Sequence, residues 1–314
     1  MKLKIWKAGL PYLALFTAHV IWGANFVVAK ITLQEFPVMS LAFLRFFMAI
    51  ILITPFLLEI EPKKRKIEVK HLPKLLSVGL FLITINIALF YEGLKRTSAI
   101  DSSVLTLIIP ILSVLGGWWF LKEKIYWINL LGITLGLSGA LFVIGLPLFF
   151  LGNFSTQGLI GNLLIILSSI SFVVGAILSK EVLKTYPPLL VLAVMFAVGA
   201  ATFSIPALLD YFNNPNWFSH ISILGLLGFL FIVILSSISA MFFMEWGFTK
   251  IDITRANLFT YIEPAVAATL AVPFLGERIS FSFIIGTCLV VLGVYWGTMG
   301  KPHHHHTEHK HHRT

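Results

Sequence analysis

The chain has 314 residues, of which 58% are hydrophobic and only 12% are charged, and its mean hydropathy is +0.92. Soluble domains carry about 25% charged residues, and disordered chains combine high charge with low hydrophobicity, so both classes are excluded. The net charge of +9 comes from basic residues between long apolar segments, which is typical of a membrane protein rather than a nucleic-acid-binding one. The single cysteine, Cys288, excludes an internal disulfide framework and a cysteine-based metal cage.

The apolar segments predict an all-α integral membrane fold with ten transmembrane helices, because a helix needs about 20 apolar residues to cross a bilayer. We expect these helices at residues 11–31, 38–58, 73–94, 99–121, 126–147, 158–179, 187–209, 221–246, 253–275 and 279–299. The uncharged stretch 125–179 is too long for one span, and Pro147 and Gly152-Asn153 divide it into two. The first apolar segment is too long for a secretory signal, so we expect it to remain as the first helix.

Basic residues predict the orientation of the chain. On this span assignment, 18 Lys and Arg residues lie on the side of the termini and 4 on the other, with Arg45 inside a span. Because basic residues concentrate on the cytoplasmic side, we expect a multi-pass protein with both termini in the cytoplasm.

The sequence matches itself in two registers. At an offset of 150, Lys30 falls on Lys180 and Pro37 on Pro187; at an offset of 154, Thr106 falls on Thr260, Pro110 on Pro264, Glu123 on Glu277 and Gly139 on Gly293. The first five-helix repeat covers residues 1–148, the second covers 156–300, and a His-rich cytoplasmic tail follows at 301–314. An odd number of spans inverts the second repeat, and inverted repeats are typical of secondary transporters with a substrate site near the middle of the membrane.

Several motifs resemble one family. Trp22-Gly23-Ala24-Asn25-Phe26, Leu44-Arg45-Phe46, Tyr261-Ile262-Glu263-Pro264 and Leu275-Gly276-Glu277-Arg278 are similar to those of EamA-type transporters in the drug/metabolite transporter superfamily. The first-half copy of the last motif, Phe120-Leu121-Lys122-Glu123, departs from it by having Lys122 where the second has Gly276. The resemblance runs from His19 to Thr298. It implies a central cavity lined by the first, third, fourth, sixth, eighth and ninth helices, and export or exchange of small metabolites, often amino acids, across the bacterial inner membrane.

Three ionisable residues inside spans are functional candidates, because charged groups are costly in a bilayer. Glu263 precedes Pro264, which can kink the helix; the carboxylate either faces the cavity to bind a substrate amine or a coupling proton, or is paired internally. Arg45 either neutralises a substrate carboxylate or has a structural role. His19 is either a proton relay or a hydrogen-bonded packing residue.

Neutral polar residues extend the candidate substrate site. Trp22 and Asn25 follow His19 at helical spacing, and either can instead serve packing. The remaining candidates are hydrogen-bonding side chains on the third, fourth and ninth helices, which line the cavity or join helices: Asn86, Tyr91, Ser103, Thr106, Asn257 and Tyr261. Glu92, Asp101, Glu245 and Asp252 lie near predicted span ends, where we expect solvated or capping roles. The Gly132-x-x-x-Gly136 motif indicates helix packing, within the chain or in a dimer.

The favoured function is a secondary transporter of small metabolites, amino acids or amino-acid-like compounds, working by alternating access. No GxxxxGK[ST] motif occurs, so the energy must come from a gradient or from exchange. One alternative is an exchanger of phosphorylated or nucleotide-linked metabolites, which needs several cations near mid-membrane. A membrane-embedded enzyme is a distant alternative, because no clustered nucleophile and base or paired acids are present. We expect no cofactor, no physiological metal and no nucleic acid; the partners are a small-molecule substrate and the lipid bilayer, with the chain a monomer or homodimer.

Overall fold

The computed structural model describes residues 2–121, 127–143, 156–279 and 281–298, and all regular structure in these ranges is helical. The first repeat contains α1 (Lys2–Thr32), α2 (Val38–Glu59), α3 (Pro62–Arg65), η1 (Val69–His71), α4 (Leu72–Gly79), η2 (Leu80–Ile85), α5 (Asn86–Arg96), α6 (Ala99–Leu105), α7 (Ile108–Leu121) and α8 (Trp127–Val143). The second contains α10 (Thr156–Val182), α11 (Pro188–Asn213), η3 (Trp217–His220), α12 (Ile223–Leu230), η4 (Phe231–Ala240), α13 (Met241–Phe248), α14 (Ile253–Ala256), η5 (Asn257–Tyr261), α15 (Ile262–Leu275) and α16 (Phe281–Thr298).

Eight helical segments in the described ranges are long and apolar enough to cross a membrane, and they coincide with the first four and the sixth to ninth predicted spans. The fifth and tenth predicted spans correspond to α8 and α16, whose described apolar parts are shorter, Leu130–Val143 and Phe283–Gly293. The ten-span count therefore stays a prediction. Pro147, Gly152-Asn153, Lys122 and the His-rich tail lie outside the described residues.

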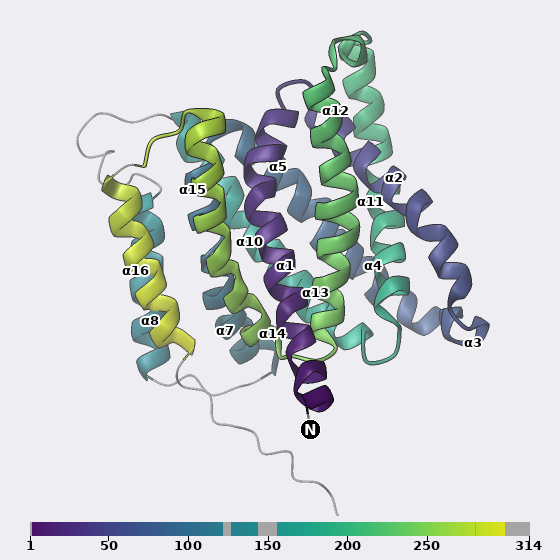
Figure 1. Cartoon of the computed structure of the whole chain (residues 1–314), viewed down its shortest axis with the longest axis horizontal. Helices are drawn as coiled ribbons and strands as arrows, with labels where there is room; N and C mark the ends of the chain where they lie inside the picture. Colours follow the sequence, from purple (N-terminus) through teal and green to yellow (C-terminus); the bar gives the residue numbers. More distant parts are fainter. Residues whose placement is uncertain (1, 122–126, 144–155, 280, 299–314) are drawn as a thin grey trace, which may run out of the picture.

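The two repeats run in opposite directions through the bundle (Figure 1). Lys74, at the start of α4, forms an ion pair with Glu181, at the end of α10. Glu35, just after α1, accepts hydrogen bonds from the backbone N–H and the hydroxyl of Ser222, just before α12. Thus α10 ends beside the segment that follows α2. The helix α1 leads into the start of α2, so it ends on the opposite side of the bundle. Because α1 and α10 are equivalent helices, this places the repeats in inverted orientation.

Two of the long helices contain an internal π-helix. Residues Leu80–Ile85 and Phe231–Ala240 occupy overlapping positions of the two repeats at the offset of 154. In the second, the hydroxyls of Ser237 and Ser239 donate to the carbonyl oxygens five residues earlier, of Ile232 and Ile234. π-Helical turns are rare and frequently occur at functional sites. Each π-helix leads into a segment that supplies side chains to the central cavity described below.

The fourth and ninth predicted spans are irregular at a proline. Pro110 has no backbone N–H, and the chain upstream of it departs from α-helix: α6 ends at Leu105, and Ile109 N donates to Thr106 O at 2.9 Å, a spacing of three residues. In the second repeat the 3-10 segment η5 ends at Tyr261, shortly before Pro264. Interrupted helices in corresponding positions are the best sequence indication of a transporter binding site.

The helices α8 and α16 pack against each other through glycines. A Cβ atom on Gly139 would lie 2.7 Å from the backbone of α16 at Gly286 O and Val290 N, which leaves room only for hydrogen. A Cβ on Gly293 would clash with Gly136 N and Gly132 O. The predicted GxxxG motif therefore serves a contact between helices within the chain.

Candidate functional site

A central cavity of about 90 Å³ lies between the two repeats. Both repeats contribute to its lining, from the first, second, third, fourth, sixth, eighth and ninth predicted spans. The lining residues are His19, Trp22, Asn25, Phe26, Arg45, Asn86, Ile87, Phe90, Thr106, Ile109, Ser168, Ser169, Phe172, Ser236, Met241, Thr260 and Glu263. The set combines apolar side chains with a few convergent polar groups, which is the usual composition of a small-molecule site.

The cavity lies where the repeats face one another. Five pairs of its lining residues occupy equivalent positions of the two repeats: His19 and Ser169, Trp22 and Phe172, Ile87 and Met241, Thr106 and Thr260, Ile109 and Glu263. An aromatic ring or a hydroxyl is kept in two of these pairs, whereas His19 and Glu263 have uncharged counterparts. The shape of the cavity is therefore shared by the repeats, and its ionisable chemistry is not.

His19 and Glu263 form a buried pair across the repeats. His19 Nδ1 lies 2.6 Å from Glu263 Oε1, and Thr106 Oγ1 lies 3.3 Å from Glu263 Oε2. The side chains are 4% and 6% exposed, so bulk water does not screen the pair. The ring of His19 packs edge-on against Trp22, with a centroid distance of 5.3 Å. The sequence left two alternatives for Glu263, internal pairing or a position facing the cavity. The structure shows both.

Arg45 is the third ionisable residue in the lining and is only 2% exposed. Its Nε donates to Ser237 Oγ at 2.7 Å and its Nη1 donates to Tyr91 Oη at 2.6 Å. The guanidinium also lies over the ring of Phe46, 4.8 Å from the centroid. Among the described residues, no carboxylate approaches Arg45 within ion-pair distance. Neutral groups hold this buried cation in place, and its charge is not compensated by the protein there.

Two other polar atoms of the lining are buried without a hydrogen-bond partner in the described part of the chain, Asn25 Oδ1 and Ser236 Oγ. Trp22 Nε1 donates to the backbone carbonyl of Ser236 at 3.2 Å, and Asn86 Nδ2 donates to Ser168 O at 2.9 Å. Buried polar atoms are nearly always paired in folded proteins. The two orphan oxygens are therefore positions where a solute or water can bind.

Seven of the eleven residues predicted for the site lie in the lining of this cavity: His19, Trp22, Asn25, Arg45, Asn86, Thr106 and Glu263. The structure places the other four elsewhere. Tyr91 holds Arg45 from behind, Ser103 Oγ donates to Ile100 O, and Asn257 Nδ2 donates to Ser113 Oγ. The hydroxyl of Tyr261 is buried and has no partner among the described residues.

Sequence reasoning missed ten lining residues: Phe26, Ile87, Phe90, Ile109, Ser168, Ser169, Phe172, Ser236, Met241 and Thr260. The repeat offsets contain the signal for four of them. Ser169 is equivalent to His19, Phe172 to Trp22, Thr260 to Thr106, and Ile109 to Glu263. Applying the symmetry to every candidate, instead of only to the helices, would have selected them.

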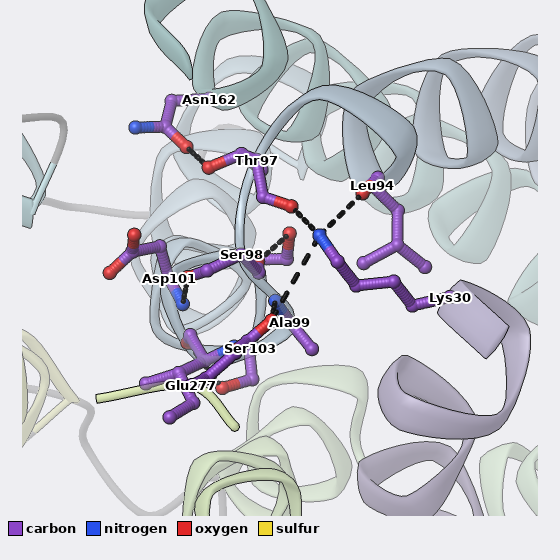
Figure 2. A network of polar contacts seen from close by, with 11 residues as sticks. Lys30, Leu94, Thr97, Ser98, Ala99, Asp101, Ser103, Asn162 and Glu277 are labelled. Carbon is purple, nitrogen blue, oxygen red and sulfur yellow. Dashed lines mark hydrogen bonds and ion pairs between the residues drawn. The ribbon is translucent and has the colours of Figure 1, made fainter. Parts of the chain in front are cut away.

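A second polar network joins several helices near the end of α1 (Figure 2). Lys30, in the last turn of α1, extends to the carbonyl oxygens of Leu94 and Thr97, and its Nζ lies 3.9 Å from Glu277 Oε1. The Glu277 carboxylate accepts hydrogen bonds from the N–H groups of Ala99 (2.7 Å) and Ile100 (3.0 Å), at the start of α6. Negative charge at a helix N-terminus is stabilising. The network thus joins α1, α5 and α6 to the segment that follows α15.

Glu245 departs from its expected solvated role. The side chain is completely buried in α13 and accepts a hydrogen bond from the hydroxyl of Ser179 in α10, while Glu245 Oε1 has no partner among the described residues. The prediction was wrong because α13 packs this face against α10 rather than against solvent. Glu92, in contrast, forms a partly exposed ion pair with Arg96.

In the described ranges, no group of three or more His, Cys, Asp or Glu side chains is placed to hold a metal ion.

Multiple apolar membrane helices, two repeats in opposite orientation and a cavity between them with a few convergent polar groups define a membrane transport protein. The chain matches the EamA-like transporter family over residues 9–145 and 159–299, which are the two repeats. It therefore belongs to this family, which is part of the drug/metabolite transporter superfamily.

Relatives cover nearly the whole chain. An uncharacterized transporter of Archaeoglobus fulgidus is 29% identical over 93% of this chain and 98% of its own length. The uncharacterized transporter YoaV of Bacillus subtilis is 23% identical over 91% and 96%, and a WAT1-related protein of Arabidopsis thaliana is 28% identical over 96% and 86%. A crystal structure that shares 18% identity superimposes with a TM-score of 0.67 over 92% of this chain, which shows a common fold.

Proposed function

We propose that this protein is a secondary transporter that moves a small, amino-acid-like metabolite across the inner membrane by alternating access, with both termini in the cytoplasm. The observation that carries the proposal is the cavity on the interface of the inverted repeats, lined by five equivalent residue pairs. Transporters with inverted repeats bind their substrates at this interface, beside interrupted helices. The family membership supports the same function, since several relatives are named uncharacterized transporters.

The chemistry of the cavity supports a small polar solute. Trp22, Phe90 and Phe172 give it an apolar body, and the His19–Glu263 pair, Arg45 and the orphan oxygens of Asn25 and Ser236 give it polar contacts. A volume of about 90 Å³ is well below the roughly 300–1,000 Å³ of sites for drug-sized ligands. The His19–Glu263 pair is also the place in the cavity where a coupling proton can reside, because an imidazole and a carboxylate can each hold one.

The contacts between α1 and α15 support a conformation closed at the end where α1 ends, which is the predicted periplasmic side. His19 meets Glu263 beside the cavity. Further along, a Cβ on Gly23 would lie 2.7 Å from Val266 Cβ, and at the end Lys30 meets Glu277. Contacts between α1 and the α15 segment thus continue from His19 to the end of α1. Alternating access follows if the repeats exchange conformations. In that exchange α1 separates from α15, while α10 and α7, their respective counterparts in the other repeat, move into close contact.

Exchange of phosphorylated or nucleotide-linked solutes has less support. A phosphate needs several converging cations, and among the lining residues Arg45 is the one permanently charged cation. Lys30 and Lys180, which such a solute would have to recruit, are bound to backbone carbonyls at helix ends.

Proteoliposomes that contain the purified chain test the proposal. A thermal-stability screen against small amino acids, organic acids, nucleosides and sugar phosphates first selects solutes that bind the folded state. The selected solute should enter the vesicles without ATP, and external excess of the same solute should compete. Absence of flux for every solute that stabilises the protein would refute transport as the function of the cavity.

A further inference from the structure

The charged groups of the cavity are unequally engaged. Both oxygens of Glu263 already have partners, His19 Nδ1 at 2.6 Å and Thr106 Oγ1 at 3.3 Å. A substrate ammonium group would therefore have to share this carboxylate with His19. Arg45 uses two of its N–H groups on protein atoms, and a guanidinium has five to donate. The unused donors belong to a cavity-lining cation with no acid partner in the described residues.

A buried cation without a counter-ion is unfavourable, and Glu263, the carboxylate of the lining, is engaged by His19 and forms no ion pair with Arg45. Arg45 does not turn away to solvent, because Tyr91, Ser237 and the ring of Phe46 hold it. Holding a guanidinium in one orientation with three of its five N–H groups unused suits it to make two parallel hydrogen bonds to a carboxylate. Tyr91 is therefore a positioning residue, which explains why it lies behind the cavity rather than in its lining.

We propose that Arg45 is the carboxylate-binding residue of the cavity, and that the transported solutes are small carboxylates for which an amino group is not required. The proposal rests on the proposed transport function and specifies its substrate class. The carboxylate occupies the unused donors of Arg45, and hydroxyl or amine donors of the solute meet the unpaired Asn25 Oδ1 and Ser236 Oγ. Recognition then begins with the acid group, and the His19–Glu263 pair remains intact when the solute binds.

Three probes with the same carbon skeleton distinguish recognition of a carboxylate from recognition of an amine. Lactate has the carboxylate without an amine, alanine has both, and alaninamide has the amine without a carboxylate. Binding to the full purified chain in detergent is measured at neutral pH by calorimetry. We expect lactate to bind at least about tenfold more tightly than alaninamide and no more weakly than alanine. Equal binding of lactate and alaninamide, or binding of alanine with none of lactate, would overturn the proposal.

Variants test the residue. Arg45→Gln should remove the preference for lactate over alaninamide, whereas Arg96→Gln, a matched change in a partly exposed arginine paired with Glu92, should leave it unchanged. If Arg45→Gln does not fold, Tyr91→Phe removes one hydrogen bond to the guanidinium and keeps the charge. This variant should weaken lactate several-fold and leave alaninamide unaffected; unchanged lactate affinity in a folded Tyr91→Phe protein would contradict the assigned role.

The binding assay and the transport assay distinguish a wrong carboxylate site from a wrong transport function. A chain that prefers lactate in the binding assay but moves no solute in proteoliposomes keeps the carboxylate site and loses the transport function. A chain that moves a solute without a carboxylate, with Arg45→Gln equally active, keeps transport and loses the carboxylate site.

Discussion

Lys30 and Lys180 make the same contacts at opposite ends of the bundle. Lys30 Nζ donates to the carbonyls of Leu94 and Thr97, and Lys180 Nζ donates to those of Phe248 (2.5 Å) and Ile251 (2.6 Å). Phe248 and Ile251 are the positions equivalent to Leu94 and Thr97 at the offset of 154. A cation on the last carbonyls of a helix satisfies groups that have no partner within the helix. The repeat symmetry thus extends to individual hydrogen bonds.

Replacing either lysine with methionine should destabilise the fold, because the stem is kept and the cation is lost. We expect about 1.5–3 kcal/mol for Lys180→Met, the range of hydrogen bonds to charged groups. Lys30→Met should cost more, since Lys30 also faces Glu277. Thermal unfolding in detergent measures both. An equal or smaller loss for Lys30→Met would show that the Glu277 contact adds nothing.

The two buried glutamates allow the effect of the same substitution on transport to be compared inside and outside the cavity. Glu263→Gln changes a cavity residue paired with His19, and Glu245→Gln changes one outside the lining. We expect Glu263→Gln to lower the transport rate about tenfold or more while the melting temperature changes little. Glu245→Gln should leave transport intact and keep or raise stability, because a neutral amide replaces a buried carboxyl group with no cationic partner in the described residues. Similar transport rates in both variants would remove the special role of Glu263.

Gly139 tests the packing of α8 on α16. Its added Cβ in Gly139→Ala would press on the backbone of Gly286 and Val290, which cannot move aside as a side-chain tip can. We expect a loss of about 1–3 kcal/mol from overpacking. Gly9→Ala is the control, because nothing lies within 4 Å of its added Cβ and alanine favours helix. Retention of full stability by Gly139→Ala in thermal unfolding would mean that the helices have room to separate.

Gly276 places Glu277 beside α6. Its φ of 65° ends α15 in the left-handed region, where glycine has no steric penalty. Because nothing lies within 4 Å of an added Cβ, Gly276→Ala tests backbone strain alone and should cost about 1–2 kcal/mol. Gly276→Asn should cost less, since asparagine tolerates this conformation better. Equal melting temperatures for both variants and the parent chain would show that this turn relaxes freely.

The sequence was sufficient for the features that follow from hydropathy and repetition. Apolar segments predicted the helices, paired positions such as Thr106 and Thr260 predicted the repeat, and Pro264 indicated a kink in the ninth helix. The π-helices Leu80–Ile85 and Phe231–Ala240 carry no comparable signal, because a shift from four- to five-residue hydrogen bonding leaves an apolar pattern unchanged.

The ionisable residues of the site could be predicted from the sequence, but their partners and ten of the lining residues could not. Glu263, His19 and Arg45 stand out in sequence because ionisable groups are rare in membrane spans. That Glu263 meets His19 while Arg45 meets Tyr91 and Ser237 depends on the rotation of each helix about its axis. Periodicity does not determine that rotation when a helix is apolar on every side, and packing between the repeats decides it.

Counterflow in proteoliposomes tests most directly whether a solute crosses through the cavity between the repeats. Vesicles are preloaded with an unlabelled solute that stabilises the purified protein, then diluted into a trace of the labelled solute without ATP. The predicted result is transient accumulation of label above its equilibrium level, sharply reduced in Glu263→Gln and retained in Glu245→Gln. Label that never exceeds its equilibrium level, or that accumulates equally in both variants, would contradict transport through this cavity.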